Sequence, residues 1–104
     1  MVEMNDLDSQ QLIEAVRVWV GWGQMMPHRD DARLVRHVGN ETAARLLPLV
    51  KLLEDDFYSS DARFVAADPQ EMHNLASKDF RQKHPTIAGE IVDAFAWCYT
   101  FDFK

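Results

Sequence analysis

The sequence predicts an all-α protein, a compact bundle of four to five helices forming a single helical domain over residues 1–104. Apolar residues recur at intervals of three and four in several segments, the spacing that places them on one face of a helix. Helix-start signals precede several of these segments, and no stretch is rich in glycine or serine as a flexible linker would be. A chain of 104 residues is near the commonest domain size, so one hydrophobic core is expected.

The first helix is expected to begin near Asp8, because Asp8 followed three residues later by Gln11 matches a capping box. Apolar residues then cover most of the circumference of the segment, including Trp19 and Trp22. Such a helix is either central to the core or shared with another subunit. A strand is the alternative for residues 17–22, where apolar side chains also alternate.

A short second helix is expected over residues 32–38. Asp30 or Asp31 can serve as its N-cap, and Gly39 suits the position just after its end.

Asn40 offers a fresh N-cap for the third and most apolar helix, which is expected to run from Thr42 to about Tyr58. Pro48 lies deep inside this run. It removes the hydrogen bond to the carbonyl of Ala44, at about 3 kcal/mol in an ordinary helix interior. Either the helix is kinked at Pro48, or two shorter helices meet there.

The clearest local helix-start signal lies at residues 68–71. Asp68 is a good N-cap, Pro69 suits the first helical position, and Glu71 follows at the third. This helix is expected to end before Pro85, because the residue before a proline avoids helical geometry. Residues 63–65 form a segment too short to classify.

Aromatic residues fall on every second position near the C-terminus. Alternation is typical of a strand, but the preceding residues show helical spacing, so we expect a helix from near Thr86 to about Thr100 and a short extended tail. Trp97 falls on the face that carries Glu90 and Asp93, where water is expected. The alternating aromatics are Phe95, Trp97, Tyr99, Phe101 and Phe103.

Composition limits the classes of function. A net charge of -6 argues against a binder of nucleic acid or anionic membranes, because both require a basic surface. No apolar run approaches the ~18 residues of a membrane span. The acidic N-terminus is unlike a leader, and the lone Cys98 fits a reducing compartment, so a cytoplasmic location is expected. Cys98, between two aromatics, is expected to be an inert core residue.

The leading functional hypothesis is a protein-binding module that self-associates, most simply as a homodimer. A chain this short forms a core too small to bury so many large side chains, and Trp and Tyr are enriched at interfaces. The candidate partner-binding residues are Trp19, Trp22, Trp97, Phe101 and Phe103.

A second hypothesis is a domain that binds a small anionic ligand or acts as an enzyme. Arg29, Arg33 and Arg36 could line one face of the second helix and hold a phosphate or carboxylate, or could simply be a solvated face. No catalytic or phosphate-binding motif supports it further. No metal or cofactor is expected, because the histidines show no metal-binding spacing. They are His28, His37, His73 and His84.

A third hypothesis is an acidic neutralising protein, resembling an immunity protein or antitoxin in its charge. Glu54, Asp55 and Asp56 lie close to the expected end of the third helix, where the helix dipole favours cations. If the helix runs on to Ser60, the conflict with the dipole is small and the cluster is simply a solvated helix end. Otherwise a basic partner or the chain's own Arg29, Arg33 or Arg36 could offset the cluster.

Overall fold

The computed structural model describes residues 6–103, with side chains from Gln10 onward. The described part of the chain contains no strand, which confirms the all-α class. Five helices of eight or more residues and one single-turn helix follow in the order α1 (Asp6–Val20), α2 (Asp31–Val38), α3 (Asn40–Tyr58), α4 (Ala62–Val65), α5 (Pro69–Lys83) and α6 (Gly89–Phe103).

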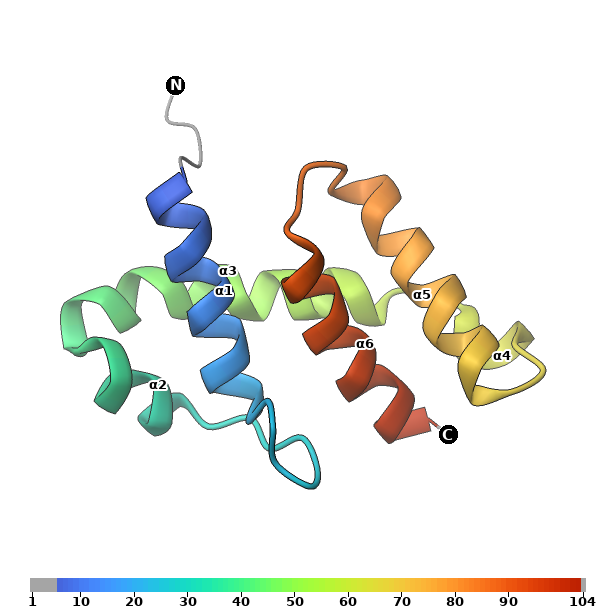
Figure 1. Cartoon of the computed structure of the whole chain (residues 1–104), viewed down its shortest axis with the longest axis horizontal. Helices are drawn as coiled ribbons and strands as arrows, with labels where there is room; N and C mark the ends of the chain where they lie inside the picture. The colour runs from blue at the N-terminus through green and yellow to red at the C-terminus, as the bar shows by residue number, and fades with distance from the viewer. Residues whose placement is uncertain (1–5, 104) are drawn as a thin grey trace.

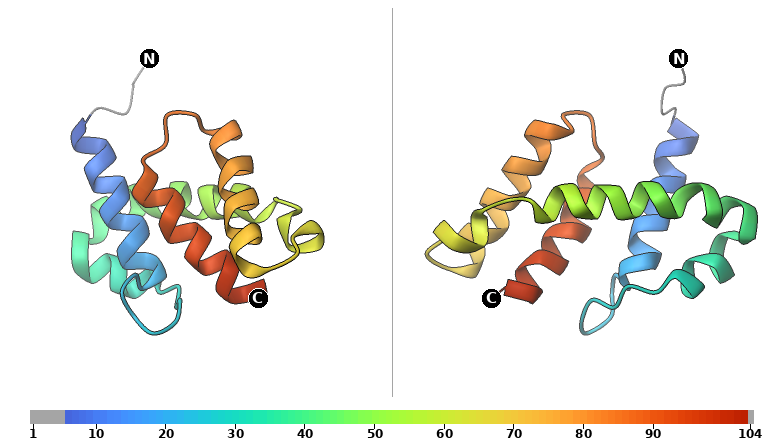
Figure 2. Two further views of the ribbon diagram at one scale, coloured as in Figure 1. Left: turned by 45° about the vertical axis from the view of Figure 1, so that its right-hand side comes forward. Right: turned by 180° about the vertical axis from the view of Figure 1, so that it is seen from behind.

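The helices form two layers. The long helix α3 crosses behind α1 and α6 and ends beside α5, as the views from the front and from behind show (Figures 1 and 2). Helix α6 lies between α1 and α5 and packs against both, whereas α2 and α4 lie near the two ends of α3 (Figure 1). The resulting body is flat, with principal extents of 42 × 33 × 18 Å. A flat body buries less of its apolar surface than a sphere of the same mass, so some large side chains stay exposed.

An aromatic cluster joins the two layers. Phe57 of α3 contacts Phe80 of α5, with ring centroids 5.1 Å apart, and Phe95 and Tyr99 of α6 at 6.0 and 5.7 Å. All four side chains are buried. The hydroxyl of Tyr99 donates a hydrogen bond of 2.9 Å to the carbonyl of Ser60, so burial leaves its polar atom satisfied. Paired aromatics of this kind fix how three helices pack together.

Capping chemistry was the most reliable local signal in the sequence. The Asp30 carboxylate accepts a hydrogen bond of 3.2 Å from the Arg33 backbone N–H, which makes Asp30 the N-cap of α2. Asp68 caps α5 in the same way, accepting from the Glu71 N–H at 2.8 Å. Gly39 follows α2 with a φ of +89°, a conformation that favours glycine. These predictions are confirmed.

Helix boundaries differ from the predictions at two other starts. Helix α1 begins at Asp6, two residues before the predicted start, and the side chain of Asp8 lies outside the described part. The strand alternative for residues 17–22 is wrong, because α1 continues to Val20. Helix α3 begins at Asn40 rather than Thr42, and Gly39 occupies its N-cap position.

Helix α3 is continuous through Pro48, so the alternative of two shorter helices is wrong. Pro48 and Ala44 both lie exposed on α3. Water can therefore hydrate the Ala44 carbonyl that the proline leaves without an N–H partner, which reduces the cost of the proline.

The predicted extended tail is wrong, because α6 begins at Gly89 and stays helical through Phe103. The ring of Phe103 contacts Tyr99 one turn earlier, with centroids 4.9 Å apart, and Tyr58 of α3 at 5.8 Å. These contacts dock the end of α6 against Tyr99 and Tyr58, and this docking holds the last turn of α6 in helical form.

Cys98 lies buried in α6, as predicted. Burial raises the pKa of its thiol to about 12, although Arg29 opposes the shift. The thiol is therefore protonated and unreactive near neutral pH. None of the helices in the described part of the chain combines the length and apolarity needed to cross a bilayer.

Candidate functional site

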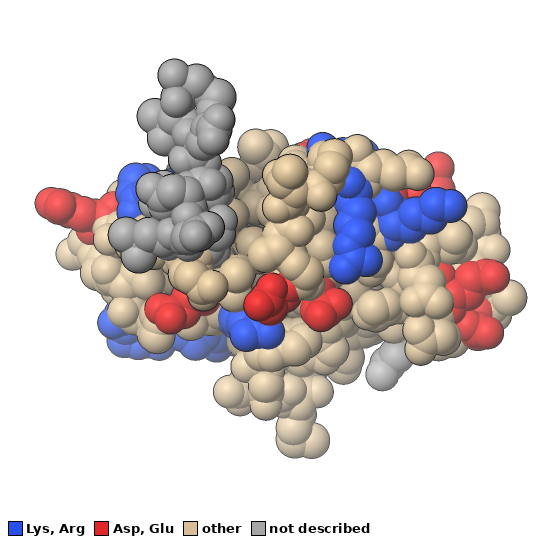
Figure 3. Space-filling view, turned by 45° about the horizontal axis from the view of Figure 1, so that its top comes forward, with Lys and Arg blue, Asp and Glu red and all other residues tan. Residues whose placement is uncertain are grey.

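One group of exposed apolar side chains lies in the loop between α1 and α2, where Trp22 meets α6. Trp22 is 40% exposed, Met25 99% and Met26 54%. Together with Trp97 of α6 these side chains form what we call the Trp22 surface. In the space-filling view the lowest protrusion, where this loop lies, is free of charged residues (Figure 3).

Trp22 and Trp97 form the fixed part of this surface. Their rings meet edge to face, with centroids 5.4 Å apart and planes at 81°. A hollow of about 270 Å³ lies beside them, lined also by Gly23 and Gln24. Trp97 is half-buried and packs against the core, so its position differs from the water-facing one that the sequence predicts. The reason is that Trp22 covers part of it.

Backbone hydrogen bonds hold the loop that carries Trp22. The Trp22 N–H donates to the carbonyl of Arg17 at 2.9 Å, across a turn in which Gly21 has a φ of +78°. At the far side of the loop, the His28 N–H donates to the Val20 carbonyl at 2.9 Å. The loop is therefore closed at its base, and its apolar side chains project from a defined position.

Arg33 of α2 secures the end of α1 beneath this loop. Its Nε donates to the carbonyl of Val18 at 2.7 Å and its Nη2 to that of Trp19 at 3.1 Å; Nη2 also donates to the His28 carbonyl. The last carbonyls of a helix have no partner within the helix and carry its negative dipole end. A guanidinium at this position satisfies them and offsets their partial charge.

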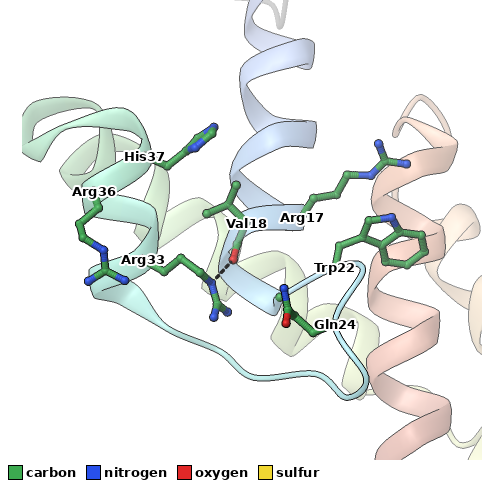
Figure 4. A pocket seen from close by; sticks show the side chains of 8 residues that line it. Arg17, Val18, Trp22, Gln24, Arg33, Arg36 and His37 are labelled. Carbon is green, nitrogen blue, oxygen red and sulfur yellow. Dashed lines mark hydrogen bonds between the residues drawn. The ribbon is translucent and has the colours of Figure 1, made fainter.

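A groove lined by three arginines and a histidine runs between the end of α1 and α2. We call it the basic groove and define it by Arg17, Arg33, Arg36 and His37 (Figure 4). It has a volume of about 420 Å³. Trp22, Val18, Gly21 and Gln24 complete the lining, so the groove and the Trp22 surface share one side chain.

The cations of the basic groove have few internal partners. The Arg17 guanidinium lies 5.4 Å from the centroid of the Trp22 ring, and its Nε has no acceptor among the described residues. Arg36 is exposed and forms no hydrogen bond or ion pair with the described part of the chain. Of the four side chains that define the groove, His37 alone meets a carboxylate of the described residues, with Nε2 3.0 Å from Glu14. The groove therefore keeps a local positive charge in an acidic protein.

The structure does not bring the three predicted arginines of the anion site together. Arg29 lies apart from the groove and reaches α3 and α6 instead. Its Nε donates to Glu54 at 2.6 Å, and its Nη2 donates to the Tyr58 hydroxyl at 2.6 Å and to Asp102 at 3.2 Å. Burial lowers the pKa of Arg29, but the hydrogen bond to Glu54 and neighbouring acidic groups outweigh it and raise the pKa above its ordinary value. Arg29 therefore stabilises the fold by joining the loop before α2 to α3 and α6.

The acidic cluster at the end of α3 is largely paired within the chain. Glu54 is held by Arg29, and the Asp56 carboxylate lies 2.9 Å from Nε2 of His84. Asp55 is exposed and has no partner among the described residues. Offset by the chain's own arginines is one of the alternatives that the sequence leaves open, and Arg29 provides it for Glu54, whereas the pairing of Asp56 with His84 was not predicted.

The remaining predicted partner-binding residues lie elsewhere. Trp19 is 4% exposed and belongs to the core, where its indole N–H donates to Asp31 at 2.8 Å. The hydrogen bonds from Lys51 and then Trp19 lower the pKa of Asp31. Phe101 is half-buried, and Phe103 lies by α4, where its ring is 4.7 Å from the Arg63 guanidinium.

Sequence reasoning did not assign a role to the methionines of the loop or to Arg17 and His37. The neighbouring methionines before Pro27 carried a usable signal, since two large apolar residues in a loop are unusual. Nothing in the sequence placed Arg17 near Arg36, because α1 and α2 meet through tertiary packing. Among the residues whose side chains are described, no group of three or more His, Cys, Asp or Glu lies close enough to hold a metal ion.

Fold and surface together describe a small all-α protein with an exposed aromatic surface beside a basic groove. No protein-family model, no curated protein and no solved structure matches this chain.

Proposed function

We propose that this chain is a protein-interaction module that contacts its partner through the Trp22 surface. The exposure of Trp22 and Met25 on a loop with a closed base carries the proposal. Contiguous exposed apolar patches on small proteins mark contact sites, and tryptophan is enriched among residues that dominate binding energy. Methionine adds an unbranched side chain that adapts to the shape of its partner.

Trp22 and Trp97 are held in place before any partner binds, which favours binding. Trp97 supports Trp22 from behind, and the backbone bonds of the loop fix its direction. Binding then loses little conformational entropy at the anchor, which otherwise costs about 0.5–1.5 kcal/mol for each side chain immobilised. Met25 and Met26 alone remain to be ordered.

Charge favours a partner segment that combines apolar and acidic residues. The basic groove borders the Trp22 surface, and Arg17 and Arg36 lack carboxylate partners in the described part of the chain. A symmetric contact between two copies through the Trp22 surface places two basic grooves side by side, and their repulsion opposes it. Acidic residues on a different protein are attracted instead.

Two expectations from the sequence stay predictions within this proposal. Self-association as a homodimer is tested by its dependence on salt, set out in the Discussion, and a cytoplasmic location stays a prediction that rests on the lone cysteine of the sequence. The neutralising function gains less support, because Glu54 and Asp56 are already paired within the chain.

The experiment is selection of peptides from a random phage-displayed library on the immobilised chain. We expect enrichment of peptides that carry an aromatic or aliphatic anchor with nearby aspartate or glutamate. Synthetic versions should lose at least about tenfold in affinity, roughly 1.4 kcal/mol, on the Trp22→Ala variant, since hot-spot truncations cost this much or more.

The matched control is Leu52→Ala. Leu52 is 56% exposed on α3, so this variant removes an exposed apolar side chain outside the Trp22 surface. Peptide affinity should be unchanged in it. Equal losses in both variants, or selected peptides that bind Trp22→Ala as tightly as the unmodified chain, would overturn the proposal.

A further inference from the structure

The geometry points to the basic groove as a binding site for an oxyanion, a carboxylate or phosphate group on a molecule that also carries an apolar part. The groove brings three arginines and a histidine together from two helices. The chain as a whole has a net charge of -6, so this concentration of cations does not follow from its general charge. It requires a local explanation.

Arg33 supplies a positioned donor. A guanidinium has five N–H groups, and Arg33 uses those of Nε and Nη2 on the carbonyls of α1 and the loop. Its Nη1 has no partner among the described residues, so two N–H groups remain on a side chain that is already held in place. A donor group fixed in advance binds an oxyanion without losing rotamer entropy.

Arg36 and Arg17 add positive charge, and neither forms an ion pair with a carboxylate in the described part of the chain. Arg36 lies one residue before His37 on α2 and is exposed beside the groove. Arg17 comes from α1 and lies over Trp22 (Figure 4). Neither Glu14, which contacts His37, nor Asp30, which caps α2, lines the groove. An oxyanion that binds at Nη1 of Arg33 therefore meets arginine side chains and no carboxylate among the described residues that line the groove.

The rest of the lining indicates what accompanies the anionic group. Trp22 and Val18 provide apolar walls, and a volume of about 420 Å³ is within the usual range for ligand sites, about 300–1,000 Å³. An acidic side chain next to an apolar residue on a partner protein has this chemistry, and so does a small organic acid. The inference does not rest on the proposed function, because a free anion can occupy the groove without any protein partner.

The test is a titration followed by NMR resonances of the arginine side chains. One arm uses succinate and inorganic phosphate as free anions. The other arm uses a short synthetic peptide that alternates glutamate with leucine, compared with the same peptide carrying glutamine. We expect saturable shifts at Arg33 and Arg36 in at least one arm, and a dissociation constant about fivefold higher or more in Arg36→Gln.

Arg81→Gln is the matched control, because Arg81 is exposed on α5 away from the groove. This variant should bind as the unmodified chain does. Tighter binding of the glutamate peptide than of succinate, lost in Trp22→Ala, identifies a protein segment as the source of the anion. Binding of succinate or phosphate that survives Trp22→Ala supports the oxyanion site and leaves the Trp22 surface unsupported.

Two results would overturn the inference. One is the absence of saturable shifts at Arg33 and Arg36 with every probe. The other is binding that Arg81→Gln weakens as much as Arg36→Gln does, because attraction by overall charge then accounts for it.

Discussion

The indole of Trp22 lies edge-on against that of Trp97, with ring centroids 5.4 Å apart and an angle of 81° between the planes. This contact joins the loop after α1 to the last helix. It supports the apolar surface that we assign to partner binding, and it leaves Trp22 40% exposed. The two indoles therefore serve stability and recognition together, and the two roles can be measured separately.

Coupling between Trp22 and Trp97 should appear in a double-mutant cycle. Trp97→Ala should lower the free energy of unfolding by about 2–3 kcal/mol, less than a fully buried tryptophan, and Trp22→Ala by about 1 kcal/mol. The double variant should lose about 1 kcal/mol less than the sum, because aromatic pairs contribute about 0.5–1.5 kcal/mol beyond their burial. Urea denaturation measures all four states. Strict additivity would mean that the contact does not hold the loop.

Two glycines of the loop offer a paired test of the Arg33 contact. Gly21 and Gly23 both have positive φ, +78° and +91°, so alanine at either position is strained by about 1 kcal/mol. A Cβ at Gly21 would also lie 3.1 Å from Nη2 of Arg33, whereas one at Gly23 meets nothing within 4 Å.

We therefore expect Gly21→Ala to cost about 2 kcal/mol and Gly23→Ala about 1 kcal/mol, because the first variant also disturbs the hydrogen bonds to the end of α1. Thermal or urea unfolding gives both values. Equal losses would show that Arg33 moves aside freely and does not secure the helix end.

Local chemistry made part of this structure predictable. Asp68 followed by Pro69 starts α5, and Gly39 separates α2 from α3, because caps and positive φ depend on a few neighbouring residues. The end of α6 was predicted less well. Alternating aromatics suggested an extended tail, but Phe103 packs on Tyr99 and Tyr58, and this tertiary contact outweighs the local pattern.

The candidate site depended on tertiary packing and was predicted only in part. Trp22 and Trp97 were both expected to bind a partner, but their mutual contact joins segments far apart in sequence. Arg29 and Arg33 looked alike in the sequence. In the fold, Arg29 pairs with Glu54, whereas Arg33 holds the carbonyls of α1. No spacing rule distinguishes these roles, because they depend on which helices meet.

Stability should fall at alkaline pH because Cys98 is buried. Its pKa rises from 9.0 to about 12 in the folded state, so its contribution is complete below pH 9 and is lost as the pH rises toward 12. In that window the unfolded chain releases a proton that the folded chain retains. The free energy of unfolding should therefore fall by about 1 kcal/mol for each pH unit.

In Cys98→Ala the free energy of unfolding should no longer show the part of its fall with pH that Cys98 causes. Urea denaturation under reducing conditions between pH 9 and 11 measures this fall. Burial, and then the hydrogen bond to Asp102, also raise the pKa of the Tyr58 hydroxyl, so a further decline above pH 10 should disappear in Tyr58→Phe. An unchanged slope in Cys98→Ala would contradict the burial of a protonated thiol.

Salt should reveal whether copies of the chain meet through the Trp22 surface. Such a homodimer brings two basic grooves together, so its association should strengthen between about 0.05 and 0.5 M salt as repulsion is screened. Sedimentation equilibrium measures the dimer constant, and Trp22→Ala should be monomeric at both salt concentrations. A dimer that persists in Trp22→Ala uses another surface and would count against this assignment. Affinity for an acidic partner should depend on salt in the opposite way, because salt screens the attraction and the affinity falls as salt rises.

The most direct test of the interaction surface is NMR mapping of a peptide selected on the unmodified chain. We predict that the indole N–H resonances of Trp22 and Trp97 and the methyl resonances of Met25 and Met26 shift together on titration. The Trp19 indole N–H, hydrogen-bonded to Asp31 in the interior, should stay in place. Shifts confined to other surfaces, such as the one around Leu52, with the Trp22 and Trp97 resonances unmoved, would contradict the account.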